Sequence, residues 1–128
     1  MSARTRIKLC GLTRAEDVAA AVMLGADAIG LVFYPPSPRH VSPQQAAELL
    51  ARLPALVSAV GLFVNPALSE VQACLQAAPI SILQFHGDET PQQCAAIAEQ
   101  VQRPFLRALR IRPTTTTSDL LEFDSAYR

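Results

Sequence analysis

Strand-like and helix-like segments alternate along the whole 128-residue chain, and this alternation constrains the fold more than any other feature. Short apolar runs typical of buried strands occupy residues 7–10, 28–33, 59–64, 82–86 and 105–111. Helix-like patterns follow them near residues 14–24, 43–53, 68–77, 91–101 and 118–127. Each strand and its helix span roughly 25 residues, a spacing that predicts parallel strands joined by helices.

The predicted helix boundaries coincide with residues that commonly begin or end helices. Ser42-Pro43 and Thr90-Pro91 each have the form of an N-cap followed by proline in the first turn. Thr13 with Glu16 has the form of a capping box, and Asn65-Pro66 indicates a break before the third helix. Residues that stop helices follow the first four patterns, namely Gly25, Pro54, Pro79 and Pro104.

Five strand-helix units are compatible with two α/β architectures. One is a doubly wound sheet of the flavodoxin or receiver type, for which this length is ordinary. The other is part of a (β/α)₈ barrel, which needs roughly 200 residues or more when complete. No linker-like stretch divides the chain, so we expect residues 1–128 to form a single domain.

Composition excludes several classes of protein. Half of the residues are hydrophobic and 17% are charged, which excludes a disordered chain. Eleven basic and eleven acidic residues cancel, so we expect neither a nucleic acid nor a membrane as partner. The cysteines at positions 10, 74 and 94 have no metal-type spacing and are odd in number, which suits the reducing cytoplasm.

Cys10 ends the first predicted strand. Side chains alternate along a strand, so Lys8 and Cys10 share one face, and an ammonium close to a thiol favours the thiolate. Gly11 then permits a sharp turn into the first helix. Because α/β enzymes keep their chemistry at the carboxyl ends of strands, Cys10 is a candidate catalytic residue. The alternative is a small buried hydrophobic residue.

Three further polar residues are candidates for ligand contacts. Arg39 follows the stiff segment 35–38, where a guanidinium can hold a carboxylate through two parallel hydrogen bonds. Gln84 and His86 alternate on one face of the fourth predicted strand. A buried Gln84 needs hydrogen-bond partners, whereas His86 lies nearer the strand end and can contact a substrate or tune the charge of a site.

Other polar residues and thiols are interpreted as structural. Asn65 is a turn residue before proline, and Glu89 precedes a helix, where negative charge is favourable. Cys74 and Cys94 lie in alanine-rich helical patterns that suit small buried thiols. The alternation alone leaves the direction of Arg107 open.

Four stretches, taken together, carry a family resemblance. They read IKLCGLT at 7–13, GADAIGLVFY at 25–34 with SPR shortly after at 37–39, VGLFVN at 60–65, and LQFHGDE at 83–89. In order and spacing they resemble the phosphoribosylanthranilate isomerase family over essentially the whole chain. The resemblance favours the parallel (β/α)₈ TIM barrel and implies that this chain holds about five of its eight βα units, an incomplete barrel.

The resemblance also implies an activity. Family members carry out an Amadori rearrangement, an intramolecular aldose-ketose isomerisation. It converts N-(5-phosphoribosyl)anthranilate to 1-(2-carboxyphenylamino)-1-deoxyribulose 5-phosphate in tryptophan biosynthesis. Cys10 matches the family's general base, and Arg39 matches the arginine that binds the anthranilate carboxylate. We expect Lys8, Gln84 and His86 to bind the same small-molecule substrate, with no cofactor and no metal.

The family's general acid is an aspartate at the end of the sixth strand, and its phosphate loops belong to the seventh and eighth units. The sequence ends before these, so we expect an amino-terminal fragment of a monomeric or homodimeric parent. Alone, it should be inactive and self-associate through unpaired edge strands. Two alternatives are a receiver-like signalling module, whose acidic residues and lysine are missing at the strand ends, and a non-catalytic half-barrel that pairs with another chain.

Overall fold

The computed structural model describes residues 3–124, in which five strands alternate with five helices. The strands are β1 (Lys8–Cys10), β2 (Ala28–Val32), β3 (Ser58–Phe63), β4 (Ile82–Phe85) and β5 (Phe105–Arg107). The helices are α1 (Ala15–Met23), α2 (Pro43–Leu50), α3 (Leu68–Ala77), α4 (Pro91–Val101) and α5 (Thr117–Leu121). The strands are parallel and pair in chain order, with β1 and β5 as the edges of the sheet. The predicted succession of parallel βα units is confirmed.

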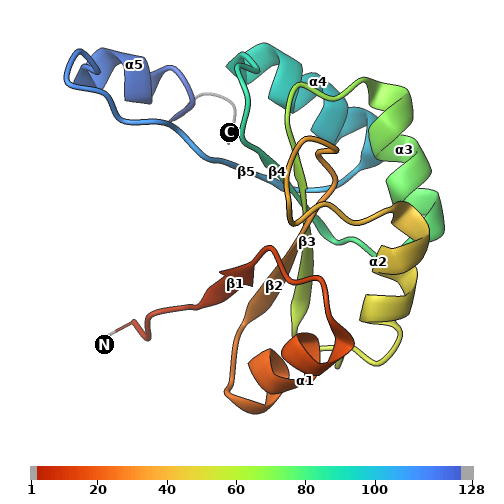
Figure 1. Ribbon diagram of the computed structural model, residues 1–128. Coiled ribbons are helices and arrows are strands. Elements are labelled where there is room, and N and C mark those ends of the chain that lie inside the picture. The colour runs from red at the N-terminus through yellow and green to blue at the C-terminus, as the bar shows by residue number, and fades with distance from the viewer. Residues whose placement is uncertain (1–2, 125–128) are drawn as a thin grey trace.

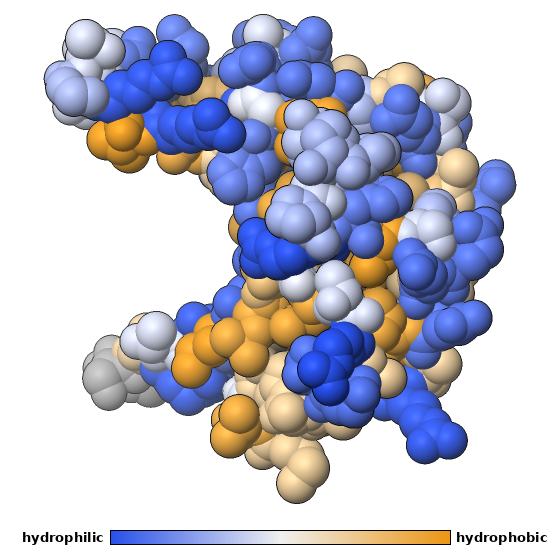
Figure 2. Space-filling model, in the orientation of Figure 1, coloured by the Kyte–Doolittle hydropathy of each residue, from blue (hydrophilic) through white to orange (hydrophobic). Residues whose placement is uncertain are grey.

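The sheet is curved, and α1 to α4 lie along one side of it while the other side is open (Figure 1). Helix α5 stands apart, beyond β5 (Figure 1). The space-filling view shows the open side as a deep hollow between two arms of the molecule (Figure 2). None of the helices within residues 3–124 is long and apolar enough to cross a membrane.

Strand register determines which side chains share a face. Cys10 pairs with Gly30, Gly30 with Val60, and Val60 with Ile82, so these residues point to the same side. The neighbouring pair Leu62 and Gln84 continues this set toward the carboxyl ends of the strands. The intervening residues point to the opposite side, toward the helices: Leu9, Ile29, Leu31, Phe63, Leu83 and Phe85.

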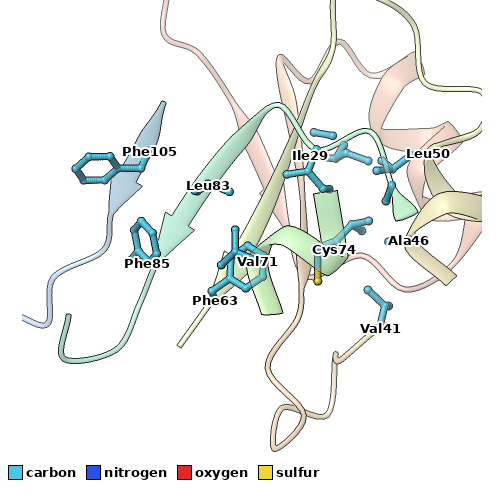
Figure 3. Close-up of a cluster of buried hydrophobic side chains, with 14 of the residues drawn as sticks. Ile29, Val41, Ala46, Leu50, Phe63, Val71, Cys74, Leu83, Phe85 and Phe105 are labelled. Atoms are coloured by element: carbon cyan, nitrogen blue, oxygen red, sulfur yellow. The ribbon is translucent and has the colours of Figure 1, made fainter. Parts of the chain in front are cut away.

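The hydrophobic core lies between the sheet and the helices. Phe63 and Leu83 from the sheet belong to one buried cluster with Val71 and Cys74 of α3 (Figure 3). Burying a side chain of this size stabilises the fold by about 1.5–3 kcal/mol. Three buried residues of the open face, Val32, Val60 and Leu62, do not belong to this cluster. The core therefore anchors the strands from the helix side and leaves the open face for other contacts.

Two predicted helix starts are confirmed, and one is wrong. The Ser42 hydroxyl accepts a hydrogen bond from the Gln45 backbone N–H at 3.1 Å, and Thr90 caps α4 in the same way. Thr13 is not the cap of α1: the N-cap is Arg14, which makes no side-chain capping bond. Glu16 thus sits at the second helical position, one too early for a capping box, and pairs with Arg14 at 3.2 Å.

The last two elements are shorter than predicted. Strand β5 ends at Arg107 rather than at residue 111, because Arg107 pairs with Phe85, the last residue of β4. Beyond that point, the described part of the chain offers β5 no neighbouring strand to pair with. The predicted helix over 118–127 is the short α5, which begins after the capping residue Thr116. Residues 125–127 of that prediction lie outside the described residues.

Candidate active site

The backbone at the end of β1 turns sharply at Gly11, as predicted. Gly11 has φ +84°, a conformation that L side chains rarely adopt. Its N–H donates to the Gly30 carbonyl at 2.9 Å, and the Leu12 N–H donates to the same oxygen at 3.3 Å. The turn leaves Cys10 half-buried on the open face of the sheet, at the carboxyl end of its strand.

The thiol of Cys10 occupies space that Gly30 leaves free. A Cβ atom at position 30 would lie 2.7 Å from Cys10 Sγ, closer than such atoms approach in real structures. Any side chain at position 30 would therefore displace the sulfur. The glycine in the middle of β2 is explained by this close approach.

Arg39 lies against the same strand end. Its Nη1 donates a hydrogen bond to the Cys10 carbonyl at 3.0 Å, and its guanidinium lies over Gly11, where a Cβ would be 2.2 Å from Nη1. The Ser37 hydroxyl accepts a bond from the Arg39 backbone N–H at 3.1 Å and shapes the loop. A guanidinium has five N–H donors, so this exposed side chain retains donors for a ligand. Two residues predicted separately are thus in contact.

Arg39 and His86 line one cavity of about 240 Å³ at the carboxyl ends of the strands. Gln84, two residues before His86, lies on the same face of the sheet and is 9% exposed. Its Oε1 has no hydrogen-bond partner within residues 3–124, so its predicted partners are not found there. Lys8 shares the face of Cys10, as predicted, but neither residue belongs to the cavity wall. The cavity wall consists of Val32, Tyr34, Ser37, Arg39, Leu62, Val64, His86 and Arg110.

A larger cavity of about 520 Å³ adjoins the first and extends toward α5. The two cavities share Tyr34, Val64, His86 and Arg110. We assign the site to the smaller one, because its wall includes Arg39, which contacts the end of β1 that carries Cys10. Arg110 was not among the residues predicted from the sequence. Alternation along 106–110 puts Arg110 on the same face as Leu106, but which face that is depends on the pairing of β5 with β4.

Arg107, whose direction the sequence left open, points to the helix side with Phe85. Arg107 and Glu89 are 7% and 4% exposed, with Nη1 and Oε1 3.5 Å apart. Arg107 also donates to the carbonyls of Phe85, Gly87 and Ala108, and its guanidinium lies 5.2 Å from the Phe123 ring centroid. This arginine is structural.

Glu89 has a different structural role from the one predicted. Its carboxylate accepts the backbone N–H of Asn65 at 2.7 Å and that of Gly87 at 2.9 Å, rather than interacting only with a helix terminus. Asn65, with φ 46°, is the predicted turn residue, and its side-chain oxygen accepts the Asp88 N–H at 2.9 Å. The Glu89–Arg107 pair therefore joins the ends of β3, β4 and β5.

The other two thiols are buried in the core cluster, as predicted. Burial raises the pKa of Cys74 and of Cys94 to about 11, so both remain protonated at neutral pH. Within residues 3–124, no three or more His, Cys, Asp or Glu side chains are grouped in a way that could hold a metal ion.

The fold and the site define a protein of the parallel βα-barrel class, with polar residues gathered at the carboxyl ends of its strands. The sequence profile of the N-(5′-phosphoribosyl)anthranilate isomerase family matches residues 7–125, and the chain belongs to this family. Isomerases of this name from Herminiimonas arsenicoxydans and Dechloromonas aromatica are 60% and 59% identical over 125 and 124 residues, or 98% and 97% of this chain. The aligned parts are 55% and 56% of those relatives, so the chain spans about half their length.

Solved structures of the family share the fold. A phosphoribosylanthranilate isomerase in complex with reduced 1-(o-carboxyphenylamino)-1-deoxyribulose 5-phosphate matches with a TM-score of 0.82 and 34% identity, over 91% of this chain and 58% of that one. The Thermus thermophilus isomerase matches with a TM-score of 0.80 and 32% identity, over 88% of this chain and 55% of that one. The five βα units correspond to part of the (β/α)₈ barrel, as the sequence predicted.

Proposed function

We propose that a full-length protein containing this chain isomerises N-(5-phosphoribosyl)anthranilate in tryptophan biosynthesis. The observation that supports the proposal most is the hydrogen bond from Arg39 to the Cys10 carbonyl, because it brings a guanidinium, a group able to bind an anion, to the strand end that carries the Cys10 thiol. Family membership and the ligand of the related complex support the same reaction.

In the proposed mechanism, Arg39 pairs with the anthranilate carboxylate and orients the substrate. A general acid protonates the ribose ring oxygen, and the C1–O bond breaks to leave a C1=N iminium. The Cys10 thiolate then removes the proton from C2. The C–H electron pair forms a C1=C2 bond, and the C=N electrons return to nitrogen. The resulting enol takes a proton at C1 and gives up the proton of its C2 hydroxyl, so that C2 becomes the carbonyl carbon of the ketose.

We propose supporting contacts for the remaining predicted residues. His86 lines the cavity with Arg39 and can donate to or accept from a sugar hydroxyl. The buried Gln84 oxygen is suited to accept a hydrogen bond from the substrate side of the sheet. Lys8 shares the face of Cys10, where its ammonium can donate to an oxygen of the substrate.

The assembly and location of the protein are also proposals. A monomer or a homodimer fits the family, since one similar structure, 33% identical with a TM-score of 0.80, is of monomers made from a dimeric isomerase from Thermotoga maritima. It matches over 91% of this chain and 58% of that one. Three free cysteines suit a reducing cytoplasm. That the 128-residue chain is inactive when expressed alone stays a prediction.

The test is an isomerase assay on the full-length protein and its Cys10→Ala variant. Loss of the general base should lower turnover by about 10²- to 10⁴-fold, with little effect on stability because the change in volume is small. Cys74→Ala is the matched control: it removes a buried thiol from α3 and should lower stability while leaving turnover unchanged. Absence of isomerase activity in the unmodified protein would refute the function. Normal turnover in Cys10→Ala would refute the role of the thiol.

A further inference from the structure

The wall of the 240 Å³ cavity contains a second arginine, to which the proposed function assigns no role. Two guanidinium groups, Arg39 and Arg110, supply positive charge, the His86 imidazole adds a polar group, and no Asp or Glu within residues 3–124 lines the wall. These three residues follow three different strands, β2, β4 and β5, so their convergence results from the fold and not from neighbouring positions in the chain. Such a wall is suited to an anion.

Arg110 differs in its bonding from Arg107, three residues earlier. Arg107 is buried against Glu89 and donates to three backbone carbonyls. Arg110 is exposed and makes no hydrogen bond or ion pair with the part of the chain that the structure describes. Its donors are therefore free for a ligand in the cavity that it lines.

The rest of the wall indicates which anion fits. Val32, Leu62 and Val64 provide aliphatic surface, and Tyr34 provides a ring. An aromatic carboxylate matches this combination, since its ring packs on apolar side chains and its two oxygens accept from guanidinium groups. The volume of about 240 Å³ lies below the range of about 300–1,000 Å³ for whole ligand sites, so the cavity suits one end of the substrate.

We propose that Arg110 is a second carboxylate-binding residue, which holds the anthranilate carboxylate from the side opposite Arg39. This inference rests on the proposed function and adds a residue to it. Arg39 keeps one N–H on the Cys10 carbonyl and offers its others to the carboxylate. Arg110, which follows β5, offers the parallel N–H donors of its guanidinium. The substrate's aromatic end is thereby held between β2 and β5.

The experiment measures binding by calorimetry in the full-length protein. The first probe is reduced 1-(o-carboxyphenylamino)-1-deoxyribulose 5-phosphate, and the second is the same molecule without the carboxylate. Arg110→Ala should weaken the first probe by about 10-fold or more, the usual effect of losing a charge-assisted hydrogen bond. It should change binding of the second probe by less than about 2-fold. Arg110→Lys, which keeps the charge and loses the fork, should give an intermediate loss.

Arg52→Ala is the matched control, because it removes the same charge from the connection between α2 and β3, at the opposite end of the strands. It should leave both affinities unchanged. An equal loss for both probes in Arg110→Ala would overturn the proposal and assign Arg110 to the phosphate. No loss for either probe would overturn it as well. If the unmodified protein binds neither probe, the proposed function fails and Arg110 fails with it. If Arg39→Ala lowers the affinity for the first probe and Arg110→Ala does not, the role of Arg110 is refuted while the proposed function stands.

Discussion

Two regions at the carboxyl ends of the strands use an arginine in opposite ways. At the ends of β1 and β2, Arg39 is exposed and donates to one carbonyl, that of Cys10. At the ends of β3 to β5, Arg107 is buried, faces Glu89 and donates to three carbonyls. We refer to these as the Cys10–Arg39 region and the Glu89–Arg107 region.

The difference separates the proposed binding role of Arg39 from the structural role of Arg107. A buried carboxylate needs charged and hydrogen-bonding partners, and Glu89 finds them in Arg107 and in two backbone N–H groups. An exposed guanidinium with spare donors contributes little to stability but can bind an anion. The Glu89–Arg107 region therefore holds strand ends in place, while the Cys10–Arg39 region is open to a ligand.

The largest effect is expected from Glu89→Ala in the full-length protein. Removing the carboxylate takes the Glu89 charge away from the buried Arg107 and frees the N–H groups of Asn65 and Gly87. Breaking such a pair costs about 3–5 kcal/mol, measured as the free energy of unfolding in denaturant. Combining Glu89→Leu with Arg107→Met should cost less than the sum of the two single changes. If Glu89→Ala were as stable as the unmodified protein, the Glu89–Arg107 region would have no stabilising role.

A smaller effect concerns two thiols, one in each region. The pKa of Cys94 is raised to about 11 by burial and by the nearby Glu89, although Arg107 opposes the shift. At pH 8 about one Cys94 in a thousand is a thiolate, the form that alkylating reagents attack. We expect Cys10 to be labelled faster than Cys94 in the native protein, as followed by mass spectrometry, because Cys10 is half-buried whereas Cys94 is fully buried. Glu89→Ala should accelerate labelling of Cys94, because it lowers that pKa and opens the region. Equal rates in the unmodified protein would contradict the assignment.

Much of the fold could be predicted from the sequence, because the signals involved are local. The alternation of patterns, the caps at Ser42 and Thr90 and the turn at Gly11 depend on a few consecutive residues. The end of β5 depends instead on where β4 stops, which no local pattern records. The direction of Arg107 likewise depends on register with Phe85, so the sequence left it open.

Only part of the site could be predicted, because only some of its residues lie in local motifs. Cys10 and Arg39 lie in motifs that carry the family resemblance, and the structure brings them into contact. Glu89 was interpreted as a residue that favours a helix terminus, but its partners lie 24 and 18 positions away in Asn65 and Arg107. Contacts of this kind become visible only when the strand ends are placed side by side.

A further prediction sharpens the role of Gly11 in the Cys10–Arg39 region. In Gly11→Ala, the new Cβ would lie 2.2 Å from Arg39 Nη1, so the guanidinium must leave its place beside Cys10. We expect KM to rise about 10-fold, the lower end of what losing a charge-assisted contact costs. Gly25→Ala is the matched control, because Gly25 has φ +86° with no atom within 4 Å of the new Cβ. Both variants share the backbone strain of about 1–2 kcal/mol, and only Gly11→Ala should change KM. Equal KM values would mean that the position of Arg39 does not matter for binding.

The smallest effect concerns an exposed ion pair, which contrasts with the buried Glu89–Arg107 pair. Asp27 accepts hydrogen bonds from the Arg4 guanidinium and from the Ile7 backbone N–H, and these lower its pKa from 3.8 to about 2. A carboxyl with a lowered folded-state pKa binds more protons when unfolded, so its contribution is present above about pH 4 and is lost as the pH falls toward 2. Asp27→Asn should therefore destabilise the protein slightly at pH 6, and the gap between the two unfolding curves should close between pH 4 and 2. Because the pair is solvent-exposed, this gap should be far smaller than the loss in Glu89→Ala. If Asp27→Asn and Glu89→Ala lowered the free energy of unfolding by similar amounts, burial would not explain the difference between the two ion pairs.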